Sequence, residues 1–156
     1  MGAPAISMKM TGVAETDRRL KALGHKMETK IARQALTAAG KPIIKTARNR
    51  LSSSKDTGAL SKSLGQRRKN FRNGNTILII GPRRGEKYWK VDGKGKVHKP
   101  TKYAHFLEKG TARSAAKPFL RPAIKTKSQA AIQAFKKKAT QLLAKETAKL
   151  KSGRGS

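Results

Sequence analysis

The sequence contains no cysteine, and this absence excludes disulfide bonds, thiol catalysis and thiolate metal ligands. Histidine is rare too, and His25, His98 and His105 are too scattered along the chain to make a metal-binding motif. No apolar run approaches the roughly 18 residues of a membrane-spanning helix, so no membrane contact is predicted. Aromatic residues make up only 4% of the 156 residues. The core is therefore expected to be small and built mainly from Ile, Leu, Ala and a few Phe.

Acidic residues are scarce, because 38 Lys and Arg stand against 8 Asp and Glu and the net charge is +30. An ordinary soluble domain carries a net charge of magnitude about 2–8, so this chain needs anions or an acidic partner surface. Composition alone favours a nucleic-acid-binding protein of the ribosomal or chromatin-like kind. The few acids form no carboxylate pair for hydrolysis or magnesium binding. His105 and Glu108 lie one helical turn apart, but such a pair is usually a surface contact. We predict no enzymatic activity, no metal and no cofactor.

Apolar residues recur every three or four positions in two long stretches, which predicts a helical region near each end of the chain. The first begins near Glu15, after a short alternating stretch at residues 6–10 that predicts a strand. Proline removes a backbone donor, so Pro42 predicts a kink or a restart near Gly40. The second helix opens at Pro122, where a missing N–H costs nothing. Its apolar face consists of Ile124, Ala131, Ile132, Phe135, Ala139, Leu142, Leu143 and Leu150.

The middle of the chain carries hairpin signals. Asn73-Gly74 is a strong turn signal, and it joins a basic strand at residues 67–72 to the apolar run at residues 77–80, which we expect to be the most buried strand. A second candidate turn lies between Trp89 and Val97, and it could form either one more hairpin or a mobile loop. The order helix, hairpins, helix predicts an α+β fold, with a small antiparallel sheet packed against an N-terminal helical region and a long C-terminal helix. Residues 1–150 are expected to form a single domain and residues 151–156 a flexible basic tail.

Two basic segments could bind a polyanion. The strand segment QRRKNFR could follow a phosphate backbone, or it could be a solvated edge strand whose charges prevent aggregation. The lysine-rich C-terminal helix has the same two interpretations. Residues that could contact DNA or an acidic partner are Arg67, Arg68, Lys69, Arg72, Arg83, Arg84, Lys136 and Lys137.

The segment YAHFLEKGTARSAAKPFLRPAI, residues 103–124, concentrates aromatic residues and prolines that are rare elsewhere. Tyr103 and Phe106 share one face of a short helix, and Gly110 lies where a helix C-terminus favours a left-handed residue. A loop of small residues follows. Phe119 and Leu120, between two prolines, could then form either a core-packing turn between two helices or a hydrophobic plug that contacts another molecule.

These motifs resemble those of a tailed-phage family, the neck or tail-completion proteins that join head to tail in long-tailed (siphovirus-type) bacteriophages. The resemblance rests on three elements in the same order as in the family. They are a Thr-Gly-x-Leu-x-x-Ser-Leu element at residues 57–64, a Glu-x-Gly-Thr element at residues 108–111 and Pro-Phe-Leu-Arg-Pro at residues 118–122. The likeness extends over residues 20–150.

The resemblance implies a virion structural protein that assembles in the host cytoplasm as a homo-oligomeric ring of six. The ring would surround the DNA channel at the head-proximal end of the tail. Its implied partners are neighbouring neck and tail proteins (the head-closure ring, the tail terminator or the tube) and the viral DNA end. The chain is more basic than the family pattern requires, so acidic neighbouring rings or DNA would have to supply anions. The implied interface residues are Thr57, Gly58, Leu60, Tyr103, Phe106, Glu108, Gly110, Thr111, Pro118, Phe119, Leu120, Arg121 and Pro122.

Overall fold

The structure is a computed structural model, and the residues that it describes are 15–16, 25–52, 58–71, 76–91, 93–95 and 97–152. The strand predicted at residues 6–10 and the Asn73-Gly74 turn lie outside the described residues. The described elements confirm the α+β fold that the sequence predicts.

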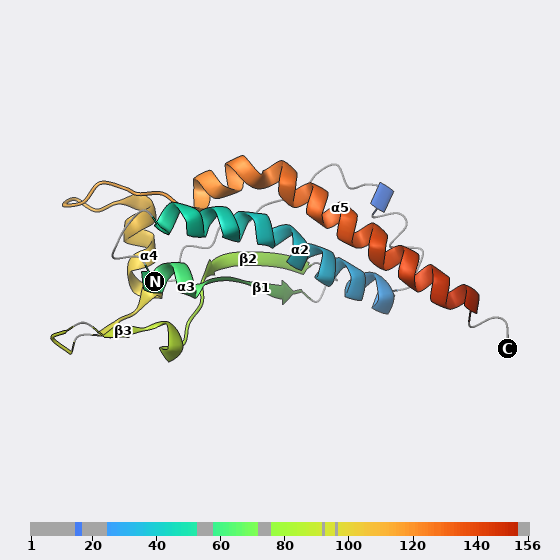
Figure 1. Cartoon of the computed structure of the whole chain (residues 1–156), viewed down its shortest axis with the longest axis horizontal. Coiled ribbons are helices and arrows are strands. Elements are labelled where there is room, and N and C mark those ends of the chain that lie inside the picture. Colours follow the sequence, from blue (N-terminus) through green and yellow to red (C-terminus); the bar gives the residue numbers. More distant parts are fainter. Residues whose placement is uncertain are drawn as a thin grey trace.

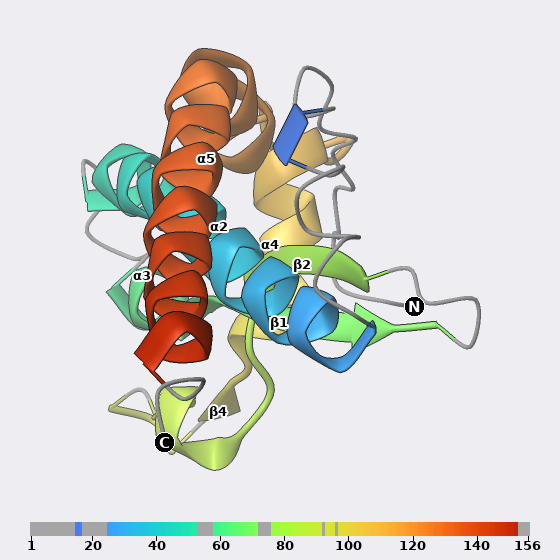
Figure 2. The same cartoon turned by 90° about the vertical axis from the view of Figure 1, so that its right-hand side faces the viewer.

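Two long helices form the scaffold. Helix α2 (His25–Ser52) and helix α5 (Leu120–Ser152) run antiparallel along most of the molecule (Figure 1), and they cross at an angle (Figure 2). Small side chains such as Ala35 and Ala131 are fully buried, which lets two helix backbones approach closely. Near the far end of the pair, Lys30 Nζ lies 3.8 Å from Glu146 Oε1. Antiparallel packing therefore brings the start of α2 to the end of α5.

Helix α2 continues through Pro42, so of the kink or restart expected near Gly40 the restart is not found. The missing backbone donor of proline normally breaks or kinks a helix. Here Ala39 and Ile43, on either side of the proline, are both buried in the core, and α2 packs against α5 and the hairpin. Tertiary packing along α2 thus outweighs the local preference.

Helix α3 (Gly58–Ser63) leads into a hairpin of strand β1 (Leu64–Asn70) and strand β2 (Thr76–Pro82). The strands pair antiparallel, from Leu64 opposite Pro82 to Asn70 opposite Thr76. Figure 1 shows the hairpin beside α2, on the side away from α5. The hairpin predicted from the sequence is therefore confirmed in its two strands.

Strand β2 is the most buried of the described strands, as we predicted, because none of its residues is exposed whereas four residues of β1 are; it is still not buried on both faces. Only Ile80 and Pro82 are buried, whereas Ile77, Leu78 and Ile79 are half-buried. The reason is that the sheet has two strands and α2 lies on one of its faces. Alternate residues of β2 therefore point to the face away from α2.

Close packing of the hairpin on α2 depends on Gly40. A Cβ at this position would collide with Gln66 Oε1 and would lie 2.8 Å from Leu78 Cδ2. Gln66 Nε2 donates a hydrogen bond of 2.8 Å to the carbonyl oxygen of Thr37, one turn earlier on α2. A glycine in mid-helix thus allows a polar side chain of the sheet to reach the helix backbone.

The remaining elements lie at one end of the molecule. A 3-10 turn, η2 (Glu86–Tyr88), precedes a second small antiparallel pair, β3 (Lys90–Val91) with β4 (Val97–His98). Helix α4 (Pro100–Lys109) follows and ends at Gly110. The second hairpin and the short helix both confirm the sequence prediction. Figure 1 shows α4 beside the first turn of α5.

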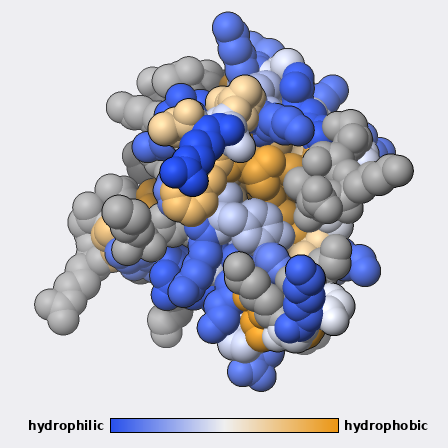
Figure 3. Space-filling model, turned by 90° about the vertical axis from the view of Figure 1, so that its left-hand side faces the viewer, coloured by the Kyte–Doolittle hydropathy of each residue, from blue (hydrophilic) through white to orange (hydrophobic). Residues whose placement is uncertain are grey.

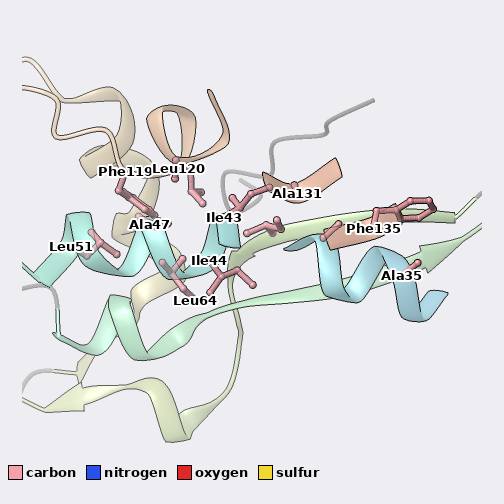
Figure 4. Packing of buried hydrophobic residues seen from close by; sticks show 14 of the residues in the cluster. Ala35, Ile43, Ile44, Ala47, Leu51, Leu64, Phe119, Leu120, Ala131 and Phe135 are labelled. Atoms are coloured by element: carbon pink, nitrogen blue, oxygen red, sulfur yellow. The ribbon is translucent and has the colours of Figure 1, made fainter. Parts of the chain in front are cut away.

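The core lies between α2 and α5 and extends to α3, α4 and the hairpin. Its buried apolar residues are Ile31, Ala35, Ala39, Ile43, Ile44, Ala47, Leu51, Leu60, Leu64, Ile80, Ala104, Phe119, Leu120, Ala123, Ala131, Phe135 and Ala139 (Figure 4). Helix α5 begins at Leu120, two residues before the expected start, and continues past residue 150 to Ser152. Within the described residues, no helix is long and apolar enough to cross a membrane.

Candidate interaction surfaces

Glu108 connects the two motifs of the segment 103–124. Its Oε2 accepts hydrogen bonds from the backbone N–H groups of Phe119 (2.9 Å) and Leu120 (3.0 Å). Its Oε1 accepts one from the N–H of Arg121 (2.9 Å). The first N–H groups of a helix have no partner within the helix, and the positive end of the helix dipole favours a carboxylate there. Glu108, which is only 4% exposed, therefore caps α5 from α4.

His105 does not form the acid–base pair with Glu108 that the sequence made conceivable. The Glu108 carboxylate holds three N–H groups of α5, whereas the His105 ring stacks on Phe106 with centroids 3.9 Å apart. Glu108 is thus a structural residue. Among the described residues, no group of His, Asp and Glu could hold a metal ion.

The loop between α4 and α5 is closed by backbone hydrogen bonds. Thr111 and Ser114 exchange two of them, at 2.9 and 3.3 Å, and the N–H of Lys117 donates to the carbonyl of Leu107 at 2.8 Å. Gly110 has φ 78°, and a Cβ there would lie 2.9 Å from the nitrogen of Ala116. The loop at residues 110–118 therefore requires glycine at its first position, both for its backbone conformation and for space.

The residues that the resemblance places at an interface differ in their exposure to solvent. Leu60, Glu108, Phe119 and Leu120 are buried within the chain itself, and Figure 4 shows Phe119 and Leu120 pointing towards the part of α2 that carries Ala47. Of the two interpretations, the structure shows the core-packing turn. The half-buried and exposed members are Gly58, Tyr103, Phe106, Gly110, Thr111, Pro118, Arg121 and Pro122. Thr57 lies outside the described residues.

These exposed residues gather at one end of the molecule, which we call the α4 end. It is formed by α4, the loop at residues 110–118 and the β3–β4 hairpin (Figure 1). Phe106, Val91 and Val97 are exposed there by 48%, 61% and 43%. Figure 3 looks onto this end and shows hydrophobic surface surrounded by hydrophilic side chains. Burial raises the pKa of Tyr103 on the same helix.

A second surface is a basic groove between α2 and the open edge of β1. It consists of two hollows, and Gln66 and Arg83 line both. The hollow with more basic residues has a volume of about 480 Å³. None of the lining residues that the structure describes is Asp or Glu. The cations that line the groove are Arg33, Lys41, Lys45, Arg48, Lys62, Arg67, Arg68 and Arg83.

Two arginines of the basic groove are held by backbone carbonyls of β1. Arg48 Nη2 donates to the carbonyl of Leu64 at 2.7 Å, and Arg83 Nη2 donates to the carbonyl of Gln66 at 3.2 Å. The Arg83 side chain passes over Gly65, where any Cβ would collide with it. Its hydrogen bond with Tyr88 lowers the pKa of that phenol, and Lys87 adds to this effect. Gly65 thus makes room for a positioned guanidinium group.

Not all of the predicted basic residues contribute to this groove. Arg67 and Arg68 line it, and Arg68 Nη1 donates to the carbonyl of Arg33 at 3.2 Å. Lys69, on the same strand, lies over the ring of Phe71, 5.1 Å from its centroid. Arg84 is exposed after β2, and Lys136 and Lys137 lie on α5, which packs on α2 rather than on the hairpin. Arg72 lies outside the described residues.

The contribution of α2 to the groove was not predicted from the sequence. Four of its cations lie at positions 33, 41, 45 and 48, and Thr37 completes this row. Steps of three and four residues place them on one helix face. The spacing could therefore have indicated a basic face on this helix. Only the position of the hairpin shows that this face lines a groove instead of simply facing solvent.

A known protein-family model matches residues 14–110, which is more than half of the chain. That family is described as "Bacteriophage HK97-gp10, putative tail-component". The match includes α2, the hairpin and α4, and it ends at Gly110, before the residues whose N–H groups Glu108 binds. No curated protein and no solved structure matches the chain.

Proposed function

Because the chain belongs to the HK97-gp10-like family of phage tail components, we propose that it is a structural protein of the phage neck. There a ring of copies, six in number, surrounds the DNA channel and joins the tail to the head. The family consists of tail components, so the chain has a structural role in the virion. Its partners are then other phage structural proteins, and the position at the neck is the proposal.

The α4 end is the observation that supports a contact between chains. Glu108 fixes α4 to the first turn of α5 by three hydrogen bonds, and two backbone contacts close the loop at residues 110–118. A surface that is rigid before binding loses less entropy on association. The exposed ring of Phe106 lies on this preformed surface and is the kind of aromatic anchor that interfaces favour. Phe106, Thr111, Pro118 and Arg121 would then contact the next copy.

The charge of the chain sets a condition on such a ring. Each copy has a net charge of +30, so several copies around one axis repel one another unless anions neutralise them. Acidic surfaces of neighbouring neck or tail proteins, or the DNA end, would supply these anions. Assembly onto tails should accordingly weaken between about 0.05 and 0.5 M salt, where surface electrostatics are screened.

An assembly assay tests the proposal. Phage particles produced without this protein should yield separate filled heads and tails, and the purified chain should restore joined particles, as counted by electron microscopy. Joining that proceeds without the protein would overturn the neck assignment. Phe106→Asp should prevent ring formation in light scattering and should abolish joining. Phe71→Asp is the matched control, because Phe71 is an exposed phenylalanine at the end of β1, away from the α4 end, and its replacement should leave both unchanged.

A further inference from the structure

The basic groove carries an inference that goes beyond the neck assignment while resting on it. We infer that the groove binds an extended acidic peptide segment of a neighbouring virion protein, with Arg48 and Arg83 as its principal carboxylate-binding residues. Three features support it: the charge that lines the groove, the prior positioning of the two guanidinium groups, and the shape of the groove with its scarcity of aromatic residues.

Among the residues that the structure describes, the charge of the groove is uncompensated: eight cations line the two hollows and no acid is among them. No stretch of ten residues in the sequence contains more than two acids, so the chain has no acidic segment that matches eight cations. In addition, Glu108 caps α5 and Glu146 lies beside Lys30 and Lys149. Charge complementarity therefore points to a different molecule and not to a second copy.

Arg48 and Arg83 are held in place before any ligand binds. Each guanidinium group has five N–H donors. The carbonyl of Leu64 holds Arg48 through one donor, whereas Arg83 donates to the carbonyl of Gln66 and also bonds to Tyr88. The remaining donors are available for a carboxylate, which arginine binds through two parallel hydrogen bonds. Because these side chains are already ordered, binding costs less conformational entropy than at a side chain that becomes ordered only on binding.

The shape of the groove favours a peptide over nucleic acid. A hollow of about 480 Å³ accommodates an extended chain but not a duplex. Single-stranded nucleic acid is usually held by aromatic rings on which bases stack, and Tyr88 is the one aromatic residue among the groove-lining residues that the structure describes.

The test is a fluorescence-anisotropy titration of the full chain. The probe is a fluorescein-labelled peptide of about ten residues with alternating Glu and Thr, a pattern that places all carboxylates on one face of an extended strand. An oligothymidylate with the same number of negative charges is titrated in parallel. We expect the peptide to bind more tightly than the oligonucleotide at equal ionic strength. Tighter binding of the oligonucleotide, lost in the groove variants, would overturn the inference in favour of a nucleic-acid site.

Matched variants distinguish binding in the groove from general electrostatic attraction to a basic protein. Lys41→Gln with Lys45→Gln removes two exposed charges from the groove, and Lys136→Gln with Lys137→Gln removes two from α5. We expect the first pair to weaken peptide binding roughly tenfold and the second pair to weaken it less than about twofold. Equal losses would overturn the inference.

A conservative variant tests the role of the positioned arginine. Arg48→Lys keeps the charge but removes the planar fork that binds a carboxylate through two parallel hydrogen bonds, so it should weaken binding of the peptide although the charge of the groove is unchanged. Unchanged peptide binding in Arg48→Lys would contradict carboxylate recognition by Arg48. All these titrations use the isolated chain. A negative result would therefore overturn the proposed acidic-peptide ligand of the groove, whereas the neck assignment is tested independently by the head–tail joining assay.

Discussion

Oε2 of Glu108 lies 3.0 Å from the backbone nitrogen of Leu120, twelve residues further along the chain. The two residues belong to different sequence motifs and different helices. Because Phe119 and Arg121 donate to the same carboxylate, one side chain sets both the start of α5 and the position of the loop before it. The α4 end is thereby ordered from inside the chain.

Removing this carboxylate should destabilise the protein strongly. Glu108→Ala leaves three N–H groups at a buried helix start without their acceptor, and we expect a loss of about 2–4 kcal/mol in the free energy of unfolding. Glu108→Gln keeps one acceptor oxygen and should lose less. Urea denaturation followed by circular dichroism measures both values. Glu86→Gln is the control, since Glu86 is an exposed acid, and it should change stability little. A Glu108→Ala variant as stable as the wild type would contradict the capping role.

Gly110 should be sensitive to substitution for two separable reasons. Gly110→Ala places a Cβ at φ 78° and also 2.9 Å from the nitrogen of Ala116, so we expect a loss of about 1–3 kcal/mol. Gly95 has nearly the same φ, 76°, with no atom within 4 Å of its added Cβ. Gly95→Ala therefore serves as a reference for an alanine at positive φ without a close contact among the described residues, and Gly110→Ala should lose more stability than this reference.

Hydrogen exchange gives a second measurement of the same change. If the loop at residues 110–118 opens in Gly110→Ala, the amide of Lys117 should exchange faster, because it loses its bond to Leu107. Equal losses of stability in the Gly110 and Gly95 variants, with unchanged exchange at Lys117, would show that the loop does not need this glycine for space.

The sequence predicted those parts of the fold that depend on local patterns. Apolar spacing indicated the two helical regions, turn residues indicated both hairpins, and the motifs indicated a tailed-phage structural family, which the family match confirms. Contacts between elements distant in sequence overrode the local signals elsewhere. Pro42 lies inside a continuous helix because α2 is packed on two sides. The two-residue shift in the start of α5 has a similar cause, because its cap arrives from Glu108 on α4.

The candidate sites show the same limit. The sequence alone left Phe119 and Leu120 open to two interpretations, a core turn or an intermolecular plug. Their burial and their packing against α2 show the core turn. The basic strand was visible in the sequence, but the groove needs Lys41 and Arg48 of α2 as well. Which helix face lies beside a sheet edge is a property of the tertiary arrangement, so periodicity alone leaves it open.

The two tyrosines should titrate in opposite directions from their ordinary pKa of about 10. A hydrogen bond with Arg83 lowers the pKa of Tyr88, and burial raises that of Tyr103. Absorbance near 295 nm should therefore show two steps, which Tyr88→Phe and Tyr103→Phe assign. A single step at the ordinary pKa would contradict both environments.

These shifts also fix the sign of the effect of pH on stability. The folded state binds the Tyr103 proton more tightly than the unfolded chain does, so this residue lowers stability as pH rises above about 10. Tyr88 has the opposite effect: its contribution rises as pH increases from its lowered pKa towards about 10. Denaturation midpoints of the two Phe variants, measured across this range, should differ from the wild type with opposite slopes.

Gly65 should control the position of Arg83 without being essential for the fold. A Cβ at residue 65 would occupy the space of the Arg83 side chain, and a flexible side chain can move aside more cheaply than backbone. Gly65→Ala should therefore displace the guanidinium group from the Gln66 carbonyl and from Tyr88. The expected result is a Tyr88 pKa that returns towards its ordinary value, as it should also do in Arg83→Gln.

Gly58→Ala is the control for this change, because an added Cβ at residue 58 meets nothing within 4 Å, and it should leave the Tyr88 titration unchanged. The same variants connect the titration to ligand binding. If Arg83 binds carboxylates only while it is held across β1, then Gly65→Ala should weaken the acidic peptide roughly as much as Arg83→Gln does. Unchanged peptide binding together with a shifted Tyr88 pKa would show that Arg83 moved and that its original position was not needed for the ligand.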